Sequence, residues 1–232
     1  RRRYPRALLP RPARMKFDFP PVTGALIVSC VVIFLLQHYG GYNDSLIAHF
    51  ALWPFGHEQA RMASGRIVTV GFEPWQLITF AFLHGGWLHI LFNMWALFLF
   101  GPPIERLFGA SKYLLYYTVC TVLAALAQLL VVKFFTGGFY PTIGASGGIF
   151  GVLLAFGMLY PHVRIMLLFP PIPMPAWLFV IGYGALELVL GVTGTEAGVA
   201  HFAHLGGMFG GLLLIQYWRG RLPLKPQQRL LR

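Results

Sequence analysis

Six apolar runs divide this chain, and five of them are long enough to cross a lipid bilayer. They cover residues 22–39, 76–100, 113–132, 146–160, 174–192 and 199–218. A spanning helix needs about 20 mostly apolar residues. With 57% hydrophobic and 11% charged residues, against roughly 45–50% and 25% in soluble domains, the chain is predicted to lie mostly in lipid. We expect an all-α membrane domain over residues 20–218, a bundle of six transmembrane helices with a short fourth helix.

The fourth run is too short to cross. From Ser146 to Tyr160 a helix would measure roughly 22 Å at about 1.5 Å per residue, against a hydrocarbon core of about 30 Å. The preceding segment 137–144 must therefore descend into the membrane, and irregular backbone at that depth has to be buried in protein or line a water-filled cavity. Ser146 is predicted to be a hydroxyl at a helix N-terminus, inside the bilayer and in contact with water.

Both ends of the chain are basic. Residues 1–19 and 219–232 are predicted to be cytoplasmic tails, because lysine and arginine beside apolar spans stay on that side. This orientation places all but three of the 18 lysines and arginines inside; the exceptions are Arg61, Arg66 and Lys133. The first tail could instead bind nucleic acid, but its position beside a span favours anchoring. We therefore predict no nucleic-acid partner.

The chain between the first two spans is neither a span nor a plain polar loop. Its segment 45–56 is rich in aromatic residues and broken by Pro54. Such a segment is typical of the membrane interface, where tryptophan is enriched. We predict an interfacial first loop, which could also shield or gate the domain laterally.

Polar side chains gather near the outer ends of the second, fourth and sixth spans. The second span carries His84, His89 and Asn93, and the sixth carries His201 and His204. One interpretation is that such residues form interhelical hydrogen bonds and have no further role. Their shared shallow depth with the serine of the fourth helix indicates a functional site instead.

Small residues explain how the fourth and sixth helices could meet. Gly147, Gly151 and Ala155 repeat every four residues on the fourth helix, and Gly207 and Gly211 do so on the sixth. Faces of this kind allow close backbone packing. Packed together, they would bring the serine to a histidine of the sixth helix.

Helical phase selects between the two histidines. At about 100° per residue, His204 lies within about 60° of Gly207 and about 20° of Gly211, whereas His201 lies about 120° and 80° away. His204 is also about 4.5 Å deeper along the helix, which suits a serine whose helix begins below the interface. We expect His204 to be the partner of the serine.

These residue types predict nucleophilic catalysis on a carbonyl. Ser146 becomes a nucleophile when a base such as His204 takes its proton. The resulting oxyanion needs preorganised donors. His89 and Asn93, four residues apart on one helix face, are the available side chains, joined by backbone N–H groups at the helix start. With no spare carboxylate evident near the histidine, we expect a dyad and interpret Glu187 as structural.

At these residues the sequence resembles the rhomboid family of intramembrane serine proteases. The resemblance covers about residues 20–218. It rests on Gly144-Ala145-Ser146-Gly147, on His89-Ile90-Leu91-Phe92-Asn93, on Ala203-His204-Leu205-Gly206-Gly207 with Gly211, and on Gly101 through Glu105-Arg106 to Gly109, all in the family's order.

This resemblance implies a six-helix fold that cleaves transmembrane proteins without a cofactor or metal. It implies Ser146 as nucleophile, His204 as base, and His89 with Asn93 as oxyanion donors. In the same way Glu105 is similar to the family's structural acid at the inner end of the second span. Phe150 is similar to the aromatic residue that packs on the catalytic histidine.

Two positions depart from the family pattern. Trp75-Gln76 stands where many relatives have Trp-Arg, and Phe80 stands where some have a further histidine. The anchoring of the first loop is therefore open.

The expected partners are single-pass transmembrane substrates, cut near the outer side of the lipid bilayer. The basic ends and the lack of an extra domain fit a bacterial plasma membrane, with an organelle membrane as the other location.

Two other function classes remain. A zinc protein could use His84, His89, His201 and His204, although their spacing lacks the His-Glu-x-x-His pattern and no acid accompanies them. A non-catalytic member of the same fold could bind or move membrane proteins. That second alternative normally goes with loss of the serine or the histidine, and both are present.

Overall fold

The computed structural model describes residues 19–166, 171–194, 200–224 and 226, and it is mostly helical. Most of the two predicted basic tails therefore lies outside the described residues. The long helices are α1 (Pro21–Tyr39), α4 (Trp87–Phe108), α5 (Ala110–Val131), α6 (Ser146–Leu159), α7 (Ala176–Thr193) and α8 (His201–Trp218). The shorter elements are α2 (Asn43–Phe50), β1 (His57–Arg61), β2 (Ile67–Gly71), α3 (Gln76–Thr79), the 3₁₀ turn η1 (Phe80–Phe82), the π-helical turn η2 (Val132–Thr136), β3 (Arg164–Met166) and β4 (Pro173–Pro175).

Four of the described helices are long and apolar enough to cross a membrane: α1, α4, α5 with its extension to Thr136, and α7. Helix α6 has 14 residues, of which ten are buried. It is enclosed by α4, α5, α7 and α8. Helix α8 has 18 residues and carries two histidines and four glycines. A short helix can therefore lie at the centre of the bundle because other helices, rather than lipid, cover its surface.

The predicted second run, residues 76–100, was wrong at both ends. Residues 76–82 form α3 and η1, the chain is extended at Leu83, and α4 begins only at Trp87. The Gly85-Gly86 pair favours this break because glycine is a weak helix former. At the other end α4 continues through Pro102 to Phe108, as membrane helices tolerate proline when neighbouring groups satisfy the backbone.

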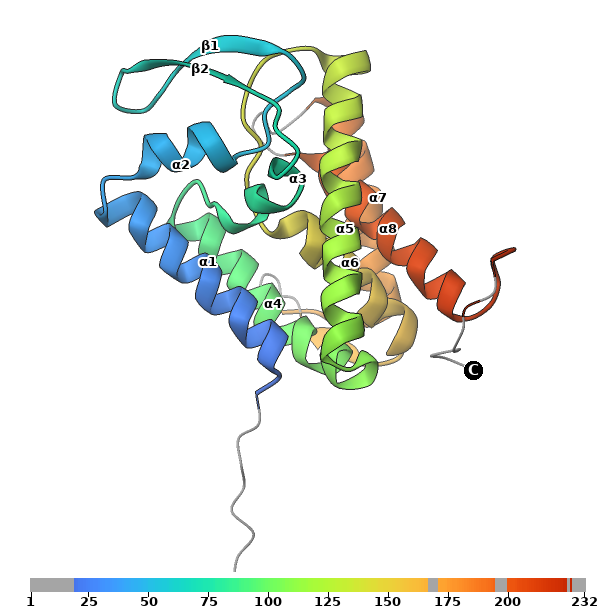
Figure 1. Ribbon diagram of the computed structural model, residues 1–232. Helices are drawn as coiled ribbons and strands as arrows, with labels where there is room; N and C mark the ends of the chain where they lie inside the picture. The colour runs from blue at the N-terminus through green and yellow to red at the C-terminus, as the bar shows by residue number, and fades with distance from the viewer. Residues whose placement is uncertain (1–18, 167–170, 195–199, 225, 227–232) are drawn as a thin grey trace, which may run out of the picture.

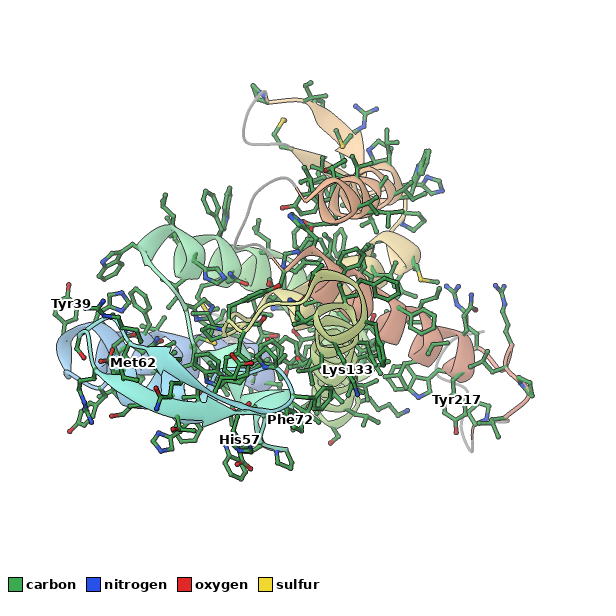
Figure 2. The ribbon with its side chains drawn as sticks, turned by 90° about the horizontal axis from the view of Figure 1, so that it is seen from above. Tyr39, His57, Met62, Phe72, Lys133 and Tyr217 are labelled. Atoms are coloured by element: carbon green, nitrogen blue, oxygen red, sulfur yellow. The ribbon has the colours of Figure 1, made fainter. Side chains whose placement is uncertain are left out.

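The expectation of an all-α chain also needs correction, because two antiparallel hairpins are present. Strands β1 and β2 pair with His57 opposite Gly71, and β3 and β4 pair with Arg164 opposite Pro175. Both hairpins are short, and the first belongs to the loop between α1 and α4. Figure 2 shows that first hairpin, which carries Met62, lying to one side of α5.

The buried carboxylate of Glu105 on α4 holds the start of α1. It accepts hydrogen bonds from the backbone N–H groups of Val22 and Thr23, at 2.9 and 2.7 Å, and from the Thr23 hydroxyl at 2.7 Å. The first N–H groups of a helix have no partner within the helix. Glu105 supplies those partners, which agrees with the structural role that the resemblance implies.

The first loop is anchored by Gln76. Its side-chain oxygen accepts from the backbone N–H of Trp53 at 3.1 Å, and its nitrogen donates to the Gly71 carbonyl at 3.1 Å. The neighbouring Trp75 donates its indole N–H to the His49 carbonyl at 2.9 Å. Glutamine therefore ties α2, β2 and the intervening chain together. The interfacial position of this loop stays a prediction.

The segment between η2 and α6 runs back from the top of α5 into the middle of the molecule, where α6 begins (Figure 1). Leu52 of the first loop pairs with Thr142 along this segment. Gly144, just before α6, has φ 128°, and a Cβ at this position would lie 2.8 Å from His89 Nε2. Only glycine fits both the backbone conformation and the space.

Helices α6 and α8 touch through their backbones. A Cβ added at Gly207 would overlap the carbonyl of Gly147, and one added at Gly151 would lie 3.0 Å from the Gly207 carbonyl oxygen. The predicted packing of the two glycine faces is therefore present. Helix α5 is a third partner, since the same Cβ at Gly151 would also clash with Cys120.

Gly207→Val should strongly destabilise the protein, because the added side chain would have to push α6 and α8 apart. Overpacking of this kind costs about 1–3 kcal/mol or more. We expect a clearly lower thermal unfolding midpoint in detergent. Gly182→Val on α7 is the matched control, since a Cβ there meets nothing within 4 Å. Equal stability of the two variants would contradict the packing described here.

Candidate active site

A cavity of about 1030 Å³ lies where α4, α6, α7 and α8 meet the segment leading into α6. Four predicted site residues line it: Ser146, His204, His89 and Asn93. Apolar side chains such as Phe92 and Phe179 make up much of the remaining wall. The cavity therefore combines a few polar groups with an apolar lining, as binding sites for substrates usually do.

Ser146 and His204 form a direct hydrogen bond across the α6–α8 contact. Ser146 is the first residue of α6, and His204 lies in the first turn of α8. The distance from Ser146 Oγ to His204 Nε2 is 2.7 Å. If the hydroxyl donates its proton, Nε2 must be unprotonated and the neutral ring then carries its proton on Nδ1. The pair has the geometry of a nucleophile and its base.

Phe150 fixes the plane of the His204 ring. The two rings stack with centroids 4.2 Å apart and an angle of 5° between their planes. Tyr183 of α7 stacks on Phe150 in turn, with centroids 5.1 Å apart. The aromatic packing on the histidine that the resemblance implies is thus present, and it restricts rotation of the imidazole.

His89 reaches the cavity from the first turn of α4. The backbone N–H of Gly85 donates to His89 Nδ1 at 3.3 Å, so in the neutral ring Nε2 carries the proton and can donate. That nitrogen lies beside Gly144, two residues before Ser146. The His89 side chain therefore offers a donor near the serine hydroxyl.

The sequence places His84 in the second apolar run, together with His89. In the structure it lies in the loop before α4 and is fully buried. Its ring meets the ring of His89 edge to face, with centroids 5.1 Å apart. Burial, and to a smaller degree the neighbouring His89, lowers the pKa of His84 to about 4. The ring is therefore neutral at pH 7 and supports His89 by packing.

Asn93 lies one turn after His89 on the same face of α4. Its side-chain nitrogen donates to the His89 carbonyl at 2.8 Å. An amide nitrogen has two protons, and this bond uses one of them. It leaves the amide fixed in orientation with a second proton to donate at the cavity wall.

Backbone donors are also present at the start of α6. The first intrahelical bond in this region runs from the Ile149 N–H to the Ala145 carbonyl. The N–H groups of Ser146, Gly147 and Gly148 therefore precede the helical bonding pattern. A helix N-terminus favours negative charge, so this end of α6 suits an oxyanion.

The expectation that no carboxylate lies near the histidine was wrong. Glu187 of α7 is buried, and its Oε2 accepts from Nδ1 of His204 at 2.9 Å and from Nδ1 of His201 at 2.6 Å. His201 therefore contacts the glutamate and not the serine. A sequence signal existed, because Glu187 lies near the end of the fifth apolar run and the two histidines lie at the start of the sixth.

The expectation that no acid accompanies the histidines fails for the same reason. Within the described part of the chain, the ligand atoms of Glu187, His201 and His204 lie within 4.8 Å of one another, a spacing that a metal ion could use. However, the two N–O separations are hydrogen-bond distances. Two ligands bound to one zinc at about 2.0–2.1 Å would stand roughly 3.3 Å apart. The cluster is therefore arranged as a hydrogen-bonded one.

This chain is similar to known proteins of one family. The family model of the Rhomboid domain matches residues 71–221. Rhomboid protein 1, mitochondrial, of Saccharomyces cerevisiae is 32% identical over 66% of this chain and 44% of its own length. Rhomboid protease GluP of Bacillus subtilis is 29% identical over 80% of this chain and 32% of its own length. Rhomboid protease GlpG of Haemophilus influenzae is 30% identical over 83% of this chain and 88% of its own length.

The chain thus spans less than half the length of the yeast and Bacillus relatives, and most of the length of the Haemophilus one. The match to the family model includes Ser146, His204, His89 and Asn93. It begins within β2 and leaves out α1, α2 and β1. The region of similarity therefore contains the whole cavity wall that carries the polar groups.

A serine-directed phosphonate probe should label Ser146, because the hydroxyl has a hydrogen-bonded base. His204→Ala removes that base and should abolish labelling. His201→Ala should keep it, since His201 hydrogen-bonds to Glu187 and not to Ser146. In-gel detection of the bound probe measures both variants. Labelling that survives in His204→Ala but not in His201→Ala would show that the base is misassigned.

Proposed function

This chain belongs to the rhomboid family, and we propose that it is an intramembrane serine protease that uses Ser146 as nucleophile and His204 as base. The observation that carries the proposal is the 2.7 Å hydrogen bond from Ser146 Oγ to His204 Nε2 at the wall of the cavity. Two relatives that are named rhomboid proteases support protease activity.

In the first half of the reaction, His204 Nε2 takes the hydroxyl proton as Ser146 Oγ attacks the peptide carbonyl carbon. The carbonyl oxygen becomes an oxyanion, and the bond from carbon to nitrogen then breaks. The departing amine takes the proton from His204, and the acyl group stays on the serine oxygen. In the second half a water gives a proton to His204 while its oxygen attacks the acyl carbon. The bond from that carbon to Ser146 Oγ then breaks and Oγ takes the proton from His204, which restores Ser146 and releases a carboxylic acid.

The oxyanion is proposed to be held by His89, Asn93 and the backbone N–H groups at the start of α6. The bond from Gly85 supports a proton on His89 Nε2, and the bond from Asn93 to the His89 carbonyl supports a fixed amide. Donors fixed in this way are worth more than water because they need no reorganisation as charge develops.

We propose that α1, α4, α5, α6, α7 and α8 are the six transmembrane helices of this membrane protein, with α6 as the short fourth one. Four of them are long and apolar enough to cross, and α6 is covered by the others. The distribution of lysine and arginine supports cytoplasmic tails at both ends. The cavity then opens toward the outer side, where transmembrane substrates would be cut.

The proposed substrates are single-pass transmembrane proteins, and the proposed location is a bacterial plasma membrane. Two bacterial rhomboid proteases support that location. An apolar cavity wall that carries a few polar groups suits a helix that unwinds to present its backbone to Ser146. The proposed hydrolysis uses Ser146, His204 and water, and it needs no cofactor.

Ser146→Ala should abolish cleavage of a model single-pass substrate by the purified protein in detergent. Its thermal unfolding midpoint should stay nearly unchanged, because one hydroxyl at the edge of a cavity contributes little packing. The rate is measured by the appearance of the cleaved fragment on a gel. Cleavage that persists in this variant would contradict the proposal that Ser146 is the nucleophile.

The same assay tests the two other function classes. A chelator should leave the rate unchanged, and a loss that zinc restores would favour the metal alternative. A protein that binds the substrate without cutting it would favour the non-catalytic alternative.

Asn93→Ala should lower the rate by on the order of 10²-fold, as loss of one oxyanion donor does in other serine proteases. His89→Ala should act similarly. Both variants should label with the phosphonate probe more slowly while keeping their fold by circular dichroism. Full activity in either one would assign the donation to the backbone alone.

A further inference from the structure

We infer that Glu187 is a positioning residue for His204, which acts on the pair of Ser146 and His204 through the histidine. The inference rests on the proposed function and extends it by one residue. Its basis is the contact of Glu187 Oε2 with His204 Nδ1 at 2.9 Å. The two side chains are 6% and 11% exposed, so water does not compete freely for that contact.

The hydrogen bonds on the two sides of the His204 ring agree with each other. For Nε2 to accept the serine proton, the neutral ring must carry its own proton on Nδ1. A buried N–H needs an acceptor, and Glu187 Oε2 supplies it. The glutamate thereby selects the tautomer in which Nε2 faces Ser146 as a base. Phe150 fixes the plane of the ring, and Glu187 fixes its rotation within that plane.

The charge of Glu187 matters once His204 has taken the proton. The ring is then an imidazolium in a site with little water, and an adjacent carboxylate stabilises it. The other titratable groups around the ring are His201 on the same helix, His89 across the cavity on α4 and Tyr183 on α7. Among these groups Glu187 is the carboxyl group, the side-chain type whose charge is opposite to that of an imidazolium.

His201 offers a competing explanation, because it binds the same oxygen at 2.6 Å. Glu187 could be present only to hold α7 to α8 through His201. The two explanations differ in what each variant removes. Glu187→Gln removes the charge next to both histidines, whereas His201→Ala removes only the His201 bond and leaves the His204 bond in place.

The test compares kcat and KM for cleavage of a model single-pass substrate by full-length Glu187→Gln, Glu187→Asp and His201→Ala. Glu187→Gln should lower kcat by at least about 10²-fold with KM within about threefold, because the glutamate acts on the chemical step. His201→Ala should keep kcat within about tenfold of the wild type. Glu187→Asp keeps the charge one methylene farther away and should lie between wild type and Glu187→Gln.

Thermal unfolding of each variant separates loss of fold from loss of function. If Glu187→Gln does not fold, Glu187→Asp and His201→Ala are compared by their rates of phosphonate labelling at Ser146. Slower labelling in Glu187→Asp supports the inference, and equal rates overturn it.

Three results would overturn the inference while leaving the protease intact: a wild-type kcat in Glu187→Gln, an equal loss of kcat in Glu187→Gln and His201→Ala, or an effect confined to KM. Failure of the proposed function looks different, because Ser146→Ala would then cleave as well as the wild type. The two failures are therefore distinguishable in one set of assays.

Discussion

The backbone contact between α6 and α8 is the constraint on which the rest of the structure depends. A helix of 14 residues cannot cross a bilayer, so it needs protein on all sides. Glycine at Gly147, Gly151 and Gly207 lets α8 approach close enough to provide one of those sides. The same approach sets the separation of the two helix starts, and it therefore determines that Ser146 and His204 are within hydrogen-bond distance.

Much of this arrangement could be predicted from the sequence, because it follows from length, spacing and helical phase. Five of the six apolar runs matched helices to within a few residues. The run 76–100 failed, since hydropathy does not register a break caused by two glycines and an extended residue. The sequence also did not predict the hairpins, because strands of five residues or fewer in a loop leave only a weak alternating pattern of apolar and polar residues.

The role of Glu187 could not be assigned from the sequence, although its position could have been noticed. Shallow depth groups the histidines, Asn93 and Ser146 in the sequence, whereas a lone glutamate on the fifth apolar run is equally typical of a structural group. Whether a side chain on α7 faces α8 depends on the rotation of α7, and that helix has few buried residues to define its phase. The hydrogen bonds of Glu187 with His201 and His204 are therefore visible in the structure and not in the sequence.

Gln76 gives the first loop a property that its fold alone would not suggest. An arginine at this position would attach the loop through a charge, and dissolved salt or anionic lipid headgroups compete for such a charge. The amide of Gln76 is buried and neutral, and its partners are backbone groups. The bonds that Gln76 makes to this loop therefore present no charge for salt or anionic lipid headgroups to screen.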